Sequence, residues 1–227
     1  IYSIRILRDE IKEPDPSRMD LGLEDDKHIK RIYEALEYHQ VLVIVAPTGT
    51  GKSTYIPFRL IEPLDGYEKD KFTKHGPIVV TQPRIPAASA IPKAIGEKLM
   101  GSHVGPGFEI GYRHGDMSGR KLGEVWDRRN RLLFVTDGTL LNWITEGKIG
   151  NYSMIIVDEA HERSTNIDLI LGLIKQELLK YPYLKLIIAS ATIDADDFVK
   201  YFDEVTTAKK LDFSGCQKSY GYEEIPW

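Results

Sequence analysis

The sequence predicts an α/β fold in which a mainly parallel sheet is covered by helices on both faces. Five short runs of β-branched and aliphatic residues are nearly continuously apolar, which is typical of strands buried on both faces of a parallel sheet. Stretches with helical spacing separate these runs, so strand and helix alternate along the chain. Because parallel strands need crossover connections, we expect the helices to lie against the sheet. The five runs span residues 41–46, 77–82, 131–136, 153–158 and 184–190.

The expected helices follow the same order. The first, at residues 28–39, precedes the first strand and has apolar residues at helical spacing. The others are expected at residues 52–61, 87–100, 138–147, 165–180 and 195–202. Pro86 and Pro92 indicate that the helix at 87–100 is kinked or interrupted, because proline removes a helix hydrogen bond. The polar stretch 63–76 is expected to be a surface insertion between a helix and the next strand.

Composition and charge limit the class of protein. With 227 residues, of which 42% are hydrophobic, the chain is long enough for one well-buried domain. The 34 acidic and 30 basic residues give a net charge of −4, so any contact with nucleic acid must be local. Cys216 is the single cysteine, which excludes a disulfide framework and a cysteine-ligated zinc site and fits the cytoplasm. No apolar stretch approaches the roughly 18 residues of a membrane span, so we expect no membrane partner.

Domain boundaries follow from shifts in composition. Residues 1–26 combine a possible strand at 1–7 with a proline- and acid-rich run, which indicates a leader or linker. The main domain is expected over residues 27–215. Because the chain opens on Ile1 and stops in the extended-looking run YEEIPW, we expect it to be an excised piece of a longer protein.

The segment APTGTGKST at residues 46–54 ends one predicted strand and opens a helix, the context that a phosphate-binding loop requires. Gly49 and Gly51 allow backbone conformations that aim N–H groups at an anion, and the following helix adds its positive N-terminal end. Lys52 would reach the β- and γ-phosphates, and the Ser53 hydroxyl would bind Mg²⁺. The alternative is a glycine-containing turn before a helix, but the pattern Gly-x-Gly-Lys-Ser arises by chance in a chain of this length only about one time in a hundred. The segment therefore predicts binding of a nucleoside triphosphate.

A second predicted strand ends in VDEAH. Taken alone, an acidic pair at a strand end is more often a solvated turn, but Asp158 would lie beside the phosphate loop and hold Mg²⁺ through a water. Glu159 would orient and deprotonate the attacking water as a general base. His161 has no partner histidines or cysteines at ligand spacing, so a hydrogen-bonding role is favoured over a zinc site. Glu162 and Arg163 form either a surface ion pair or a polar link to a partner domain.

Five motifs occur in order along the chain: APTGTGKST, TQPRIPAA, TDGTLL, DEAHERS and SAT. Together they resemble the first RecA-like domain of DEAH-box helicases of superfamily 2, over residues 25–215. The segment SATIDADDFVKYF at 190–202 also resembles the extended third motif of that family. The resemblance implies a RecA-like phosphate-loop NTPase fold that uses ATP and Mg²⁺. It also implies a parent helicase that couples ATP hydrolysis to unwinding or translocation on nucleic acid, RNA more than DNA.

The resemblance further implies roles for individual residues. The triphosphate-binding residues are Thr48, Gly49, Thr50, Gly51, Lys52, Ser53 and Thr54. The catalytic residues are Lys52, Asp158, Glu159 and His161, with Ser53 and Asp158 at the magnesium ion. Single-stranded nucleic acid is expected, without sequence preference, beside Pro83, Arg84, Thr136, Asp137 and Gly138. The residues expected to link the nucleotide state to domain closure are His161, Ser190 and Thr192.

Several positions leave alternatives open. Thr136 and Asp137 are also candidates for the N-terminal cap of the next helix, and the two roles can coexist. Ile85 stands where the family commonly has a second arginine, which removes one potential contact. Ala94 stands where the family has an adenine-stacking arginine, so the resemblance does not predict base selectivity. Four other arginines are local basic contacts or, more often, a solvated face: Arg113, Arg128, Arg129 and Arg131.

The resemblance implies that a second RecA-like domain of the same parent chain supplies the arginine fingers for hydrolysis, worth about 10³–10⁵ in rate. Residues 216–227 would begin the connection to that domain. We therefore expect the chain alone to bind Mg·ATP weakly and to hydrolyse it poorly. One alternative is a phosphate-loop ATPase that acts on a partner other than nucleic acid. Another is a degenerate scaffold module, against which the intact Lys52, Ser53, Asp158 and Glu159 argue.

Overall fold

Seven strands form one parallel sheet in the computed structural model, which describes residues 23, 25–62, 64–68, 70–101, 103–105, 108–114, 129–191 and 195–216. Across the sheet the strands are ordered β3-β4-β2-β5-β6-β1-β7, and each neighbouring pair is parallel. In chain order they are β1 (Val41–Val45), β2 (Ile78–Gln82), β3 (Ile110–Arg113), β4 (Leu132–Thr136), β5 (Met154–Val157), β6 (Lys185–Ser190) and β7 (Ala208–Asp212). The parallel sheet that the sequence predicts is confirmed.

Helices alternate with these strands, as the crossover connections of a parallel sheet require. The α-helices are α2 (Asp26–Tyr38), α3 (Tyr55–Ile61), α4 (Ile85–Ala94), α5 (Asp137–Thr145), α6 (Thr165–Lys180) and α7 (Ala195–Asp203). Shorter helical segments are the π-helix η1 (Ile95–Leu99) and the 3₁₀ helices η3 (Ile149–Asn151) and η4 (Ala160–Glu162).

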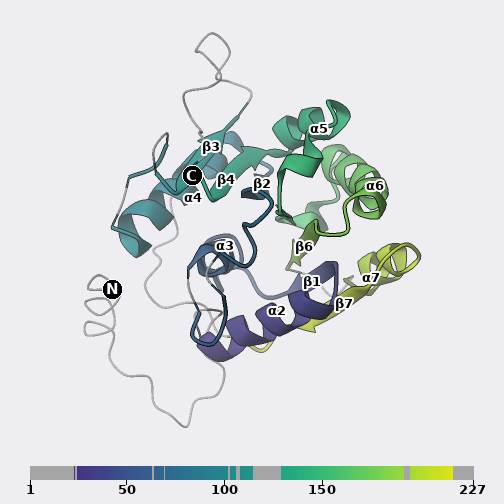
Figure 1. The fold of residues 1–227 in the computed structure, drawn as a ribbon, viewed down its shortest axis with the longest axis horizontal. Helices are drawn as coiled ribbons and strands as arrows, with labels where there is room; N and C mark the ends of the chain where they lie inside the picture. The colour runs from purple at the N-terminus through teal and green to yellow at the C-terminus, as the bar shows by residue number, and fades with distance from the viewer. Residues whose placement is uncertain are drawn as a thin grey trace.

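The six described α-helices cover the two faces of the sheet, three on each (Figure 1). One face packs α2, α3 and α4 against residues such as Leu42, Ile44 and Phe134. The other packs α5, α6 and α7 against alternate residues of the same strands, including Val43 and Val135. Successive residues of a strand point to opposite faces, so each central strand needs apolar residues at every position. This requirement explains why the central strands are recognisable in the sequence.

The sequence prediction missed the two edge strands, β3 and β7. The last two residues of β3, Tyr112 and Arg113, are only half-buried, and Leu211 is the single buried residue of β7. An edge strand has a neighbour on one side only and is covered less completely. Such strands lack the continuous apolar run by which the five central strands were predicted.

Two predicted helices begin or continue differently in the structure. The helix predicted from residue 52 begins at Tyr55, because residues 51–54 form turns. The helix predicted at 87–100 begins at Ile85 and continues through Pro92 to Ala94, and the predicted interruption follows there, where the π-helix η1 replaces the α-helix. Pro86 lies in its first turn, where the backbone N–H groups have no partner within the helix. The helical pattern changes only at η1, beyond both prolines.

The connection between α3 and β2 is partly buried, although its polar sequence predicts a surface insertion. Leu64 and Phe72 belong to the core. The ring of Phe72 packs edge-on against Tyr33 of α2, with 4.8 Å between the ring centroids. Two apolar residues therefore anchor this otherwise polar segment to the face that α2 covers.

Some predicted features lie outside the described residues. These are the strand at 1–7, most of the leader at 1–26, Arg128, and the connection at 216–227 beyond Cys216. In the part of the chain that the structure describes, no helix combines the length and the apolar character needed to cross a membrane.

Gly76, just before β2, leaves no room for a side chain. Its φ is +143°, and a Cβ atom there would overlap the carbonyl oxygen of Asn151. Gly66, in the same connection, has a φ of +87° but faces open space. We expect Gly66→Ala to lower the free energy of unfolding by about 1–2 kcal/mol, and Gly76→Ala to lower it by about 1–3 kcal/mol more. Urea unfolding measures both, and equal losses would contradict a close approach at Asn151.

Candidate active site

Five segments meet at the carboxyl edge of the sheet. They follow β1, β2, β4, β5 and β6, all of which are parallel. Ligands of open α/β sheets bind at this edge, because the strand ends and the helix starts converge there. The N–H of Ala46 donates to the carbonyl oxygen of Ser190 at 3.1 Å, so the phosphate loop (residues 46–54) begins directly beside the end of β6.

The phosphate loop is closed around the side chain of Lys52. The Lys52 ammonium donates hydrogen bonds to the carbonyl oxygens of Ala46, at 2.6 Å, and Pro47, at 2.8 Å. The hydroxyl of Thr50 donates to the same Pro47 oxygen at 2.8 Å. Lys52 is only 4% exposed, so these two carbonyl oxygens satisfy an ammonium group that water barely reaches.

Gly49 and Gly51 shape the backbone of the loop, with φ values of 82° and 94° that glycine adopts without strain. The N–H groups of Thr54, Tyr55 and Ile56 all donate to the carbonyl oxygen of Gly51, at 3.3, 2.7 and 3.2 Å. This turn forms the end of the loop, and α3 begins directly after it at Tyr55, so the loop opens a helix as predicted, three residues later than residue 52.

Lys52 is coupled electrostatically to the acidic end of β5. Burial lowers the pKa of Lys52, and the carboxylates of Asp158 and Glu159 raise it. These groups come from strands separated by β6 in the sheet. The structure thus brings together the cation and the acidic pair that the sequence placed in two distant motifs.

Asp158 has a fixed orientation at the end of β5, where it is 1% exposed. Its Oδ1 atom accepts the backbone N–H of Glu159 at 2.9 Å, and its Oδ2 atom accepts the side-chain amide of Gln82 at 2.7 Å. Its own N–H donates to the hydroxyl of Thr81 at 3.4 Å. Both carboxylate oxygens are hydrogen-bonded, as a buried charged group requires.

Glu159 lies between Asp158 and His161. Burial and the neighbouring Asp158 raise the pKa of Glu159, while Lys52 and His161 lower it. The Nε2 atom of His161 lies 3.4 Å from Oε2 of Glu159, and its Nδ1 atom accepts the N–H of Ala191 at 3.3 Å. Because Nδ1 is an acceptor, the neutral ring carries its proton on Nε2, toward Glu159. His161 therefore makes a hydrogen bond, as the sequence favoured, with the segment that follows β6.

The donor set of this site suits a magnesium ion bound together with a triphosphate. Among the described residues, no group of three or more His, Cys, Asp or Glu side chains could hold a metal. Mg²⁺ usually takes one or two protein oxygens and completes its shell with waters and phosphate oxygens. The hydroxyl of Ser53 and the carboxylate of Asp158 are hard oxygen ligands of this kind, so these residues fit the ion.

Residues 26–200 match the model of the DEAD/DEAH box helicase family. The chain belongs to this family. The match contains the phosphate loop, the acidic end of β5 and the motifs between and after them. The resemblance carried by the five sequence motifs is therefore confirmed, and so is the RecA-like α/β fold expected from it.

Three relatives show how far the similarity reaches. The chain is 40% identical over 178 residues to ATP-dependent RNA helicase HrpA of Borreliella burgdorferi, covering 78% of this chain and 20% of the relative. It is 38% identical over 184 residues to the pre-mRNA-splicing factor ATP-dependent RNA helicase prp22 of Schizosaccharomyces pombe, covering 80% and 14%. Against ATP-dependent RNA helicase DHX33 of Drosophila melanogaster, identity is 36% over 179 residues, covering 76% and 24%. The chain thus spans less than a quarter of the length of each relative.

The segments predicted to contact nucleic acid lie side by side, because β2 and β4 are paired neighbours. Arg84 follows β2, is exposed, and lies 3.9 Å from the carboxylate of Glu162. Pro83, before it, is half-buried. A side chain on Gly138, after β4, would face open space. The five predicted contact residues therefore come from adjacent strand ends.

Thr136 takes the N-cap position of α5, but its side chain does not cap a backbone N–H. Its hydroxyl pairs instead with the hydroxyl of Thr139 at 2.9 Å. Asp137 lies in the first turn of α5, where a negative charge interacts favourably with the helix dipole. Thr136 therefore occupies the predicted cap position, but it does not make the hydrogen bond of a capping side chain.

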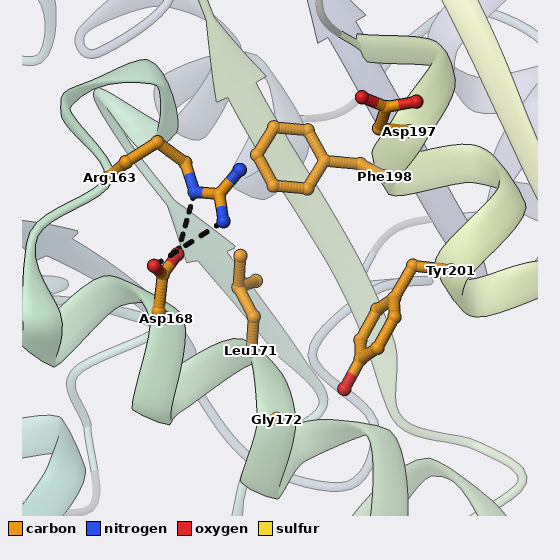
Figure 2. Close-up of a pocket in the computed structure, with 7 residues that line it drawn as sticks. All are labelled: Arg163, Asp168, Leu171, Gly172, Asp197, Phe198 and Tyr201. Atoms are coloured by element: carbon orange, nitrogen blue, oxygen red, sulfur yellow. Dashed lines mark hydrogen bonds and ion pairs between the residues drawn. The ribbon is translucent and has the colours of Figure 1, made fainter.

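Arg163 closes the acidic motif and lies against a groove between α6 and α7 (Figure 2). Its guanidinium donates to the two carboxylate oxygens of Asp168, at 2.7 and 3.4 Å, and lies 5.7 Å from the centre of the Phe198 ring. The groove has a volume of about 350 Å³ and is also lined by Leu171 and Tyr201. Arg163 thus pairs with Asp168 of the same domain, whereas Glu162 lies beside Arg84.

Thr81 and Gln82 have no predicted role, although both lie in the motif TQPRIPAA. Both side chains contact Asp158. Their role could have been predicted from the sequence, because they are two polar residues at the carboxyl end of an otherwise apolar strand, where the site was expected. Of the predicted coupling residues, Ser190 is buried at the end of β6, and Thr192 lies outside the described residues.

Asp137 is a buried acid with an unusual protonation equilibrium. It is 4% exposed, and its Oδ1 atom has no hydrogen-bond partner among the described residues. Its pKa is raised to about 6, mainly by burial and also by the carboxylates of Glu162 and Asp158, against the lowering effect of a hydrogen bond with Thr81. Compared with the unfolded chain, the folded state therefore favours the protonated form of Asp137.

The raised pKa of Asp137 gives a stability change with a definite sign. Its stabilising contribution is fully present below the ordinary pKa of 3.8 and is lost as the pH rises through about 6. Asp137→Asn stays neutral, so we expect this variant to be more stable than the natural chain above pH 6, by about 1–3 kcal/mol. The difference should shrink toward pH 4. Urea unfolding at several pH values measures it.

Asp197→Asn is the matched control, because it makes the same substitution at an exposed aspartate in the first turn of α7. Its effect at each pH is subtracted from that of Asp137→Asn. Parallel stability profiles for the Asp137→Asn variant and the natural chain would show that Asp137 is ionised normally in the fold.

Proposed function

We propose that this chain is the ATP-binding and hydrolysing domain of a DEAH-box helicase, and that its parent protein couples ATP hydrolysis to unwinding or translocation on RNA. The observation that carries the proposal is the buried carboxylate of Asp158, which is hydrogen-bonded in place and electrostatically coupled to Lys52 of the phosphate loop. Family membership supports it, and so do the names of three relatives, each an ATP-dependent RNA helicase.

In the proposed complex, residues 48–54 hold the triphosphate. The ammonium group of Lys52 exchanges the carbonyl oxygens of Ala46 and Pro47 for oxygens of the β- and γ-phosphates. This exchange is favourable because hydrogen bonds to charged acceptors are roughly twice as strong as those to neutral ones. Ser53 and Asp158 would hold Mg²⁺, which when bound would neutralise negative charge on the phosphate oxygens.

Glu159 is proposed as the general base. It orients a water molecule against the γ-phosphorus and accepts a proton from it as the new P–O bond forms and the bond to the β–γ bridging oxygen breaks. The products are ADP and inorganic phosphate. A pKa raised by burial and by Asp158 suits a group that must hold this proton. His161 lies 3.4 Å from this base and accepts a hydrogen bond from Ala191, so it connects the base to the segment of Ser190 and Thr192, which we propose for coupling.

Single-stranded RNA is proposed to cross the ends of β2 and β4. The contact residues are Pro83, Arg84, Thr136, Asp137 and Gly138. The exposure of Arg84 and the open space at Gly138 support this path. One guanidinium, hydroxyl groups and backbone N–H groups bind a sugar-phosphate backbone without reading bases, so we propose binding that is independent of sequence.

A second RecA-like domain of the parent chain is proposed to complete the site with arginine fingers. The three relatives are more than four times as long as the segment they share with this chain, which leaves room for such a domain in proteins of this family. The chain alone is therefore proposed to bind Mg·ATP weakly and to hydrolyse it slowly. The cytoplasm is proposed as its compartment, on the basis of its single cysteine.

The ATPase rate of the full-length protein, with and without single-stranded RNA, tests this proposal. We expect Glu159→Gln to lower kcat by about 10²–10⁴-fold with ATP binding retained, because only the proton acceptor is lost. Lys52→Ala should weaken ATP binding itself. Lys148→Ala, which removes an exposed lysine in the connection after α5, is the control. Rapid turnover that survives Lys52→Ala would contradict the proposed site.

The nucleic-acid partner is tested separately with Arg84→Ala. We expect this variant to keep the basal ATPase rate and to lose most of the stimulation by single-stranded RNA, because one phosphate contact is removed. Single-stranded DNA in place of RNA tests the choice of nucleic acid. If no polynucleotide stimulates the natural protein, a phosphate-loop ATPase that acts on another kind of partner becomes the better account.

A further inference from the structure

Gln82 is the last residue of β2 and is 3% exposed. Its side-chain amide donates to Oδ2 of Asp158 at 2.7 Å, in a hydrogen bond that is itself buried. The other carboxylate oxygen of Asp158 accepts the backbone N–H of Glu159. Lys52, the cation coupled to this acid, donates to Ala46 and Pro47 instead. The Gln82 amide is therefore the side-chain donor that orients Asp158 among the described residues.

The sheet gives β2 a position from which it can orient this acid. β2 lies between β4 and β5, and Thr81 is paired in register with Val157, the residue before Asp158. Thr81 accepts the backbone N–H of Asp158 and is also hydrogen-bonded to Asp137 at the start of α5. Two successive residues of β2 thus hold the backbone and the side chain of Asp158.

We propose that Gln82 is the positioning residue of the magnesium site. Its amide holds the Asp158 carboxylate in the orientation in which that carboxylate takes Mg²⁺ together with ATP. An amide suits this role because it carries no charge to compete with the metal and donates from a fixed direction. Partners of this kind orient metal ligands in proteins generally, and their loss costs about 10–100-fold in metal affinity. The inference rests on the proposed function of the site.

Gln82 also lies between the proposed RNA contacts and the proposed magnesium site. Pro83 and Arg84, which we propose to contact RNA, follow it directly in the chain. A movement of this strand end on RNA binding would therefore move the hydrogen-bond donor of Asp158. No further segment is needed to connect the nucleic acid with the metal ligand.

The test is the binding of a fluorescent ATP analogue to full-length protein as Mg²⁺ is titrated. Gln82→Met keeps the length of the side chain and removes its donor. We expect the Mg²⁺ concentration for half-maximal nucleotide binding to rise about 10–100-fold, with binding in the presence of EDTA unchanged. A merely structural role would not produce this split, because loosening of the fold would weaken both kinds of binding.

Gln40→Met is the matched control. The Gln40 amide is also hydrogen-bonded within the fold, to the carbonyl oxygens of Leu178 and Tyr181 at 3.0 and 3.1 Å, but it lies before β1, at the opposite end of that strand from the phosphate loop. This variant should keep the Mg²⁺ dependence of the natural protein. An equal shift in both glutamine variants would overturn the proposal. If Gln82→Met does not fold, Gln82→Leu, which is also uncharged and has no donor, is expected to show the same loss.

The two proposals fail in different ways. If the natural protein shows no nucleotide binding that depends on Mg²⁺, the proposed function itself is wrong. If it shows such binding and both Gln82 variants keep its Mg²⁺ dependence, the site stands and the positioning role of Gln82 is wrong.

Discussion

The parallel pairing of β2 with β5, and of β6 with β5 and β1, brings the carboxyl ends of these strands to one edge of the sheet. The candidate site depends on this constraint. Lys52 and Asp158 are separated by more than 100 residues in the chain, yet they are electrostatically coupled because β1 and β5 flank the same strand. The hydrogen bond between Gln82 and Asp158 depends on the same pairing, since an antiparallel neighbour would bring its amino end to this edge.

The site holds several charged groups that burial disfavours. Lys52, Asp137 and Asp158 are each at least 96% buried. They differ in how the cost of burying their charge is offset. Lys52 and Asp158 keep hydrogen-bond partners that satisfy their charges. Asp137 has one carboxylate oxygen without a described partner, and burial raises its pKa. Departures of this kind gather at functional sites, where binding rather than stability determines the residue.

The backbone of Glu159 is also in an unfavourable conformation. Its φ of 51° is a conformation that costs a residue with a side chain about 1–2 kcal/mol, and Arg163 has a similar φ of 49°. The two residues flank η4 and turn the chain sharply between β5 and α6. This turn leaves Glu159 beside His161, and through His161 beside the residue that follows β6. The strained turn therefore brings the proposed base into contact with the segment proposed for coupling.

The sequence by itself determined the five central strands, the helices between them and the family, because buried parallel strands are apolar throughout and the motifs follow at their carboxyl ends. It did not reveal β3 and β7, since edge strands are only partly covered and carry mixed residues. Nor could it show that Lys52 lies against Ala46 and Pro47, or that Gln82 orients Asp158. Only the tertiary structure decided these contacts, because local patterns predict which residues form a strand but not which strands become its neighbours. The pKa of Asp137 was decided in the same way, by the burial and the carboxylates that the folded chain places around it.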